Sequence, residues 1–258
     1  MRRRKRKVIV EAYDLSRHPY LDGNPKLEEI DPMQRGFHRE VNRQKTDFGA
    51  EAERRITEVL AGIPGGRVLS DVYFLTGRYS EELELYYSMQ IDDVFINKSG
   101  AFVIEVKNYG GSEVVIKGCA DACNWKKNGK GMPNGSAQNR NHGAFVKQLF
   151  DFLGLDVPVY TITVICGVRR DGILVQEFID DNLIPEEELV DRISYLGKRS
   201  MASVDVDAVC AAIESWKCIP SEERRRLHIR MCRALENNST GVPKRCKGDK
   251  KCFVAFRK

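Results

Sequence analysis

The sequence predicts an α/β fold in which a central sheet is flanked by helices and followed by a C-terminal helical extension. Nearly unbroken apolar runs at residues 101–106 and 157–168 are typical of strands that are covered on both faces. Segments 47–61 and 136–153 instead carry apolar residues at helical spacing. Helices that alternate with buried strands indicate a sheet with helices packed against it.

Composition places the chain among ordinary globular proteins. Of its 258 residues, 42% are hydrophobic and 31% are charged, and no apolar run approaches the length that spans a bilayer. The eight cysteines show no disulfide-framework spacing, and the basic N-terminus is not followed by the apolar core of a secretory signal. We therefore expect free thiols, a cytoplasmic location and no membrane partner.

Positive charge is concentrated at the two ends of the chain. Residues 1–7 carry +6 and residues 220–258 carry +8, so residues 8–219 carry −9 within the total of +5. An acidic, metal-binding core between basic arms that attract phosphate explains this distribution. Solvated termini that keep the protein soluble explain it equally well.

The stretch 90–108 holds the candidate catalytic residues. Two strand-like runs are joined by Asn-Lys-Ser-Gly at 97–100, which predicts a β-hairpin. Because strand side chains alternate at period two, Glu105 and Lys107 point to one face, and Asp92 on the partner strand could lie opposite them. Two carboxylates and an ammonium at a strand end suggest a Mg²⁺ site for phosphodiester cleavage. A rim ion pair with an unrelated aspartate is the alternative.

Polar residues on the two predicted helices could reach this site. Glu53 flanks the apolar stripe of helix 47–61 and could support the metal, with an exposed salt-bridging glutamate as the alternative. Gln138 and His142 lie four residues apart on helix 136–153 and should point at the sheet near the N-terminal end, where phosphate is favoured. A satisfied polar pair at the edge of the core is the alternative for these two.

A lysine-rich segment is a candidate nucleic-acid contact. Residues 118–135 are rich in Gly, Lys and Asn, and we expect a long loop beside the site. Trp125 in this loop could stack on a base or sugar, or it could be the hydrophobic anchor of the loop. The lysines around it are Lys126, Lys127 and Lys130.

A second basic surface is predicted near the C-terminus. A helix that starts at Ser221 should turn Leu227 and Met231 inward. Its other face is basic enough to lie against nucleic acid, although a solvated arginine face is the simpler account. The arginines assigned to this outer face are Arg224, Arg225, Arg226, Arg230 and Arg233.

The order of these elements resembles the PD-(D/E)xK nuclease fold and, more narrowly, the NERD (nuclease-related) domain, over about residues 46–170. The matching pieces are residues 49–53, 90–92, 102–108 followed by Gly110, and Asn134-x3-Gln138 with His142. Two positions depart from the family pattern. Gly135 replaces the proline that usually follows the asparagine, and Asp93 stands where a histidine is frequent.

The resemblance implies a restriction-endonuclease-like core with a mixed central sheet. It implies Mg²⁺ or Mn²⁺ as cofactor, held by Asp92 and Glu105. It also implies a catalytic constellation of Glu53, Asp92, Glu105 and Lys107, with Gln138 accessory. The expected domains are a basic arm and irregular lead-in (1–46), the nuclease-like domain (47–170), a helical extension (171–236) and a basic flexible tail (237–258).

The implied function is a divalent-metal-dependent nuclease, acting on DNA ahead of RNA. A catalytically silent module that binds nucleic acid through the same fold is the alternative. Asp92, Glu105 and Lys107 together favour the nuclease, since a binding module would not need all three. A protein-interaction adaptor built on the C-terminal helices is a third reading, and assembly with a partner protein or a second copy stays open.

Overall fold

A computed structural model of the chain describes residues 43–80, 85–110, 114–119, 124–176, 182–218 and 221–240. The expected N-terminal arm and nearly all of the lead-in, together with the tail from 241 onward, lie outside the described residues. None of the described helices is long and apolar enough to cross a membrane.

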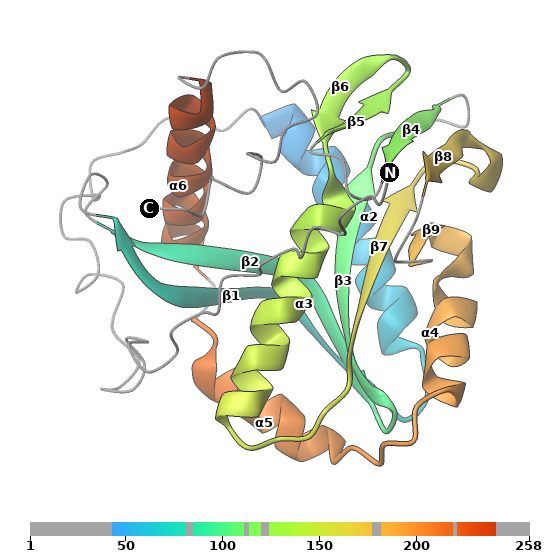
Figure 1. The fold of residues 1–258 in the computed structure, drawn as a ribbon, viewed down its shortest axis with the longest axis vertical. Helices are drawn as coiled ribbons and strands as arrows, with labels where there is room; N and C mark the ends of the chain where they lie inside the picture. Colours follow the sequence, from blue (N-terminus) through green and yellow to red (C-terminus); the bar gives the residue numbers. More distant parts are fainter. Residues whose placement is uncertain are drawn as a thin grey trace, which may run out of the picture.

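A five-stranded mixed sheet forms the centre of the fold (Figure 1). Its order is β1 (Arg67–Ser80), β2 (Leu85–Asn97), β3 (Gly100–Asn108), β7 (Val159–Cys166) and β9 (Leu183–Pro185). The first three strands are antiparallel neighbours, whereas β3, β7 and β9 run parallel. The predicted hairpin is present, because Asn97 pairs with Gly100 across a two-residue turn. The expected mixed sheet flanked by helices is therefore confirmed.

Helices cover both faces of this sheet. Helix α2 (Arg43–Ala61) packs its apolar stripe on one face, where α4 (Leu189–Lys198) joins it. Helix α3 (Gly135–Phe152) and α5 (Val206–Trp216) cover the other face. Along β3, alternate side chains enter the two resulting cores, with Phe102 and Ile104 under α2 and Val103 under α3. This double coverage explains why the strand reads as an unbroken apolar run.

A second, four-stranded sheet replaces the long loop expected at 118–135. Its order is β6 (Lys130–Pro133), β5 (Asn124–Lys127), β4 (Ile116–Cys119) and β8 (Ile173–Gln176). Asn128 and Gly129, at φ values of 46° and 81°, form the two-residue turn between β5 and β6. Asn-Gly is the pair that tolerates two successive left-handed residues, and it therefore favours this hairpin over a loop.

The C-terminal part contributes strands as well as helices. Strand β8 belongs to the four-stranded sheet and β9 to the five-stranded sheet. The short 3-10 helices η4 (Arg170–Gly172) and η5 (Glu186–Glu188) adjoin these strands in sequence. Helix α6 (Glu222–Thr240) packs on β2 (Figure 1). Ser88 contacts the helix in two places. Its Oγ lies 3.0 Å from Nδ1 of His228, and its backbone N–H donates to Sδ of Met231 at 3.2 Å.

Candidate active site

The candidate site forms where β2 leaves β3. The ladder between them runs from the Asn97–Gly100 pair to the Asp93–Ile104 pair and ends there, so Asp92 is the first β2 residue outside it. Asp92 Oδ2 accepts a 2.7 Å hydrogen bond from the backbone N–H of Val106. The Asp92 carboxylate is therefore held against the end of β3 although the two backbones have stopped pairing.

Glu105 and Lys107 lie near the end of β3 on the face that α3 covers. Glu105 is 1% exposed, and its Oε1 is ion-paired with Lys107 Nζ. Its Oε2 lies 3.2 Å from Nδ1 of His142, which is itself buried. Within the described residues, neither oxygen of Glu105 receives a well-aligned hydrogen bond. The carboxylate therefore keeps lone pairs that a ligand could use.

Burial and neighbouring charges set the ionisation of these three groups. Burial raises the pKa of Glu105, but Lys107 and His142 outweigh it and leave the pKa below its ordinary value. Burial and then the charge of Glu105 raise the pKa of Asp92 well above its ordinary value. Burial lowers the pKa of Lys107, yet Glu105 and Asp92 raise it by more, so the side chain stays an ammonium at neutral pH. A cation between the two carboxylates would relieve the repulsion that Asp92 experiences.

Glu53 extends this electrostatic neighbourhood from the other side of the sheet. It is half-buried on α2, and burial raises its pKa. The charge of Arg225 lowers that pKa, and Asp71 and Glu105 raise it. The charges of Lys107 and Glu105 also act on the pKa of Glu53, and its role at the site stays a prediction.

Asp71 is an acidic residue beside the site that the sequence reasoning missed. It lies on β1 opposite Asp92, between the Ser70–Asp93 and Val72–Ile91 pairs of the ladder. Its φ of 49° is left-handed, a conformation rarely held by residues other than glycine. The signal was present in the sequence, because an aspartate interrupts the otherwise strand-like run at 67–74.

Helix α3 presents His142 and Asn139 to the sheet, not Gln138. Gln138 is exposed, so the expectation that it points at the sheet is corrected. The buried amide is that of Asn139, whose Nδ2 donates to the backbone oxygens of Val103 at 3.2 Å and Ile162 at 2.8 Å. His142, expected to contact nucleic acid, is instead buried against Glu105. The stripe of buried residues at 142, 146 and 149, extended back by three residues, would have identified Asn139.

The start of α3 explains the first departure from the family pattern. Asn134 caps the helix, with its Oδ1 accepting from the backbone N–H of Ala137 at 3.0 Å. A Cβ atom added to Gly135 would lie 3.2 Å from Cγ and 3.4 Å from Cε of Lys107. The larger ring of proline would press further on that side chain. Gly135 therefore leaves room for Lys107.

The second departure, Asp93, faces away from Asp92. It is fully buried, and its Oδ1 accepts from Thr57 Oγ1 on α2 at 2.8 Å. Burial raises its pKa to about 7. Asp93 thus links β2 to α2 on the face opposite Asp92, Glu105 and Lys107.

Trp125 is placed as an anchor and not as a stacking platform. It is 0% exposed and packs with Ile116 and Met132 in a small core below the second sheet. A Cβ atom on Gly118 would lie 2.5 Å from its ring, which shows how closely β4 covers it. A fully covered indole cannot stack on a base, so the proposed nucleic-acid contact at Trp125 is corrected.

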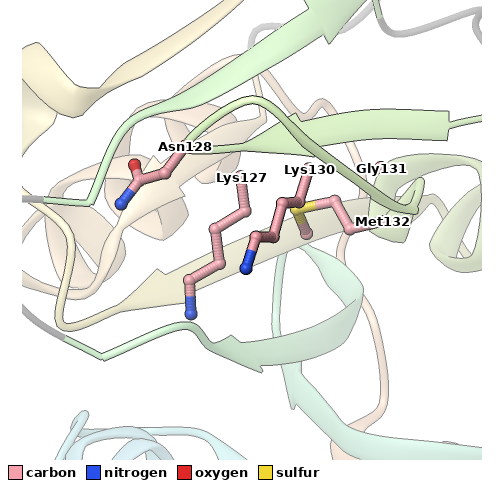
Figure 2. Close-up of a pocket in the computed structure, with 5 residues that line it drawn as sticks. All are labelled: Lys127, Asn128, Lys130, Gly131 and Met132. Carbon is pink, nitrogen blue, oxygen red and sulfur yellow. The ribbon is translucent and has the colours of Figure 1, made fainter.

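The lysines around Trp125 remain on the surface. Lys126 and Lys130 are exposed, whereas Lys127 is half-buried and its Nζ donates to the backbone oxygen of Tyr109 at 2.5 Å. Figure 2 shows the Lys127 and Lys130 side chains extending together from the β5–β6 hairpin. They line a pocket of about 380 Å³ with Asn128, Gly131 and Met132.

The donor set determines which metal could bind. Among the described residues, no group of three or more His, Cys, Asp or Glu side chains is arranged as a metal cluster. Mg²⁺ keeps several of its waters and often takes only one or two protein carboxylates. Asp92 and the lone pairs of Glu105 match that requirement, which Mn²⁺ shares. They do not match the tetrahedral set that Zn²⁺ prefers.

Comparison with known proteins adds one finding. Residues 48–166 match the family model described as nuclease-related domain. The matched segment contains Glu53, Asp71, Asp92, Glu105 and Lys107, and it ends before α4, α5 and α6. Neither the curated proteins nor the solved structures gave a match.

Proposed function

The chain carries a nuclease-related domain of the PD-(D/E)xK superfamily over residues 48–166, and we propose that it is a divalent-metal-dependent nuclease that hydrolyses phosphodiester bonds in DNA. One observation carries the proposal. Asp92 is bonded to the end of β3 beside Glu105, which pairs with Lys107 on the face under α3. Mg²⁺ or Mn²⁺ as the ion and a cytoplasmic location complete the proposal.

An ion held by Asp92 and Glu105 would supply Lewis-acid stabilisation of the charge that develops on the phosphoryl group. The chain supplies the rest. Lys107 stays protonated, so it can donate a hydrogen bond to the attacking water or to a phosphoryl oxygen, but it cannot accept a proton. Glu105 is ion-paired with Lys107, and Nδ1 of His142 lies 3.2 Å from the second oxygen of Glu105. Asp71, opposite Asp92 on β1, and Glu53 on α2 would orient water.

The test is a plasmid-nicking assay on the full chain with Mg²⁺ or Mn²⁺, run beside single-stranded DNA and RNA substrates. We expect cleavage that stops with EDTA and falls at least about 10²-fold in Asp92→Ala and Glu105→Ala, the scale of losing a preorganised catalytic group. Asp207→Ala removes the same charge from a carboxylate that is 86% exposed and should leave the rate unchanged. Binding without cleavage under either ion, unaffected by Asp92→Ala, would replace the nuclease by a silent binding module.

A further inference from the structure

Helix α6 lies outside the residues that match the nuclease-related domain, yet it packs on β1 and β2, the strands that carry Asp71 and Asp92. His228 meets Ser88 and also the ring of Tyr73, at 5.7 Å between centroids, and Tyr73 pairs with Gln90. Helix α6 therefore runs along the paired strands β1 and β2, and the helical turn that precedes His228 lies nearer to Asp92 than His228 does. The backbone N–H of Cys218 donates to the backbone oxygen of Tyr73 at 2.7 Å, so the chain also meets β1 shortly before the helix begins.

That first turn carries a buried guanidinium. Arg224 is 4% exposed and shares the inward stripe with Leu227 and Met231, which corrects its expected place on the outer face. Its Nε is buried, and no described residue gives its side chain a hydrogen bond or an ion pair. Guanidinium does not lose its proton in proteins, and an unpaired buried charge is strongly disfavoured. Arg224 therefore requires an anionic partner.

Arg225 is the next residue of this turn. It is half-buried and likewise has no hydrogen bond or ion pair through its side chain to any described residue. Its charge nevertheless lowers the pKa of Glu53 and acts on Tyr73. Arg226, the next residue, is exposed, and its Nε donates to the carboxylate of Glu222 at 3.2 Å. Unlike Arg224 and Arg225, Arg226 therefore has an acidic partner among the described residues.

We propose that Arg224 and Arg225 bind a backbone phosphate of the nucleic acid beside the acidic site, an inference that rests on the proposed nuclease function. The fork of a guanidinium fits phosphate through two parallel hydrogen bonds, and the N-terminal end of a long helix favours the same anion. The acidic site by itself repels the strand that it must hold. Two cations at its edge offset that repulsion and fix the register of the strand.

The test measures DNA binding by fluorescence anisotropy on the full chain, with Ca²⁺ replacing Mg²⁺ to suppress cleavage. Arg224→Gln and Arg225→Gln should each lower the affinity about 10-fold and reduce the slope of log K against log salt by about one. Arg226→Gln removes the same charge from the exposed face of the same helix, and we expect less than a twofold change. If both inner variants bind like the wild type, the phosphate site is disproved, while cleavage by the wild type still upholds the nuclease.

Thermal unfolding of Arg224→Met separates a phosphate partner from a structural one. Methionine removes a buried charge without a partner, so Tm should stay equal or rise while DNA affinity falls. A Tm several degrees lower, or failure to fold, would show that Arg224 is paired inside the protein, with a carboxylate from outside the described residues, and would overturn the proposal. Arg225→Gln, at a half-buried position, gives an independent measure of phosphate binding.

Discussion

The carboxylate of Asp92 accepts a hydrogen bond from the backbone N–H of Val106, at the point where β2 and β3 have stopped pairing. A hydrogen bond of this kind contributes about 0.5–1.5 kcal/mol, so this contact can hold the side chain in place without the ladder. It keeps Asp92 beside Glu105 while the β1–β2 ribbon diverges toward α6. The candidate site therefore lies where β2 and β3 separate, and the side chain of Asp92 bridges the space between the two strands.

Lys107 is the residue whose loss should separate catalysis from metal binding. Lys107→Ala removes the ammonium but leaves both carboxylates, and single-turnover cleavage should fall about 10³-fold, the size of losing a preorganised donor. Mn²⁺ affinity measured by calorimetry should change little. Lys198→Ala removes an exposed lysine at the end of α4, outside the matched domain, and should cleave at the wild-type rate. A Lys107→Ala protein with the wild-type cleavage rate would exclude the proposed role.

Asn139 should matter for stability because it bridges two strands. Asn139→Ala leaves the buried carbonyls of Val103 and Ile162 without their donor and should lower the free energy of unfolding by about 2 kcal/mol. Urea denaturation measures this difference. Gln138→Ala, at the exposed neighbouring position, should stay within about 0.5 kcal/mol of the wild type. Equal midpoints for the two variants would contradict the bridging role.

The central hairpin and its charges could be predicted because they follow from local rules. Asn97 to Gly100 is turn chemistry, and period-two alternation places Glu105 and Lys107 on one face without any knowledge of the fold. The same rules applied to Asn128-Gly129 would have predicted the β5–β6 hairpin, but the lysine-rich composition favoured a loop.

The surroundings of the site could not be predicted because they depend on packing between distant segments. Ser88 meets His228 across 140 positions of sequence, and the docking of α6 that includes this contact places Arg224 inward. Trp125 is buried only because a second sheet forms around it. Helical periodicity does indicate which side of α6 is apolar, but Arg224 occupies the inward stripe as a charged residue, which no hydrophobic pattern anticipates.

Asp71 should constrain substitutions through its backbone, although its side chain is exposed. A β-branched residue is strained at a φ of 49°, so Asp71→Val should lower the free energy of unfolding by about 1–2 kcal/mol. Asparagine tolerates the left-handed region, and Asp71→Asn should unfold within about 0.5 kcal/mol of the wild type. Urea midpoints compare the two proteins directly. Identical midpoints for valine and asparagine would show that the backbone relaxes there.

His228 should make the docking of α6 sensitive to pH. Burial lowers its pKa from 6.5 to about 4, so the imidazole that contacts Ser88 and Tyr73 is neutral in the folded protein at neutral pH. The unfolded chain binds a proton near pH 6.5, whereas the folded chain does not until about pH 4. Linkage then requires this contribution to stability to be complete above pH 6.5 and to be lost progressively as the pH falls toward 4.

The matching measurement is urea denaturation of the wild type and His228→Gln at pH 7.5, 6 and 5. Other titrating groups are common to both proteins, so their effects cancel in the difference between the two unfolding free energies. Glutamine has no proton to gain, and we expect it to cost stability at pH 7.5 by losing the Tyr73 contact. That deficit should shrink steadily at pH 6 and pH 5, because only the wild type pays for keeping a histidine neutral. A deficit that stays constant across the three pH values would mean that His228 titrates normally in the folded protein and that α6 docks without burying it.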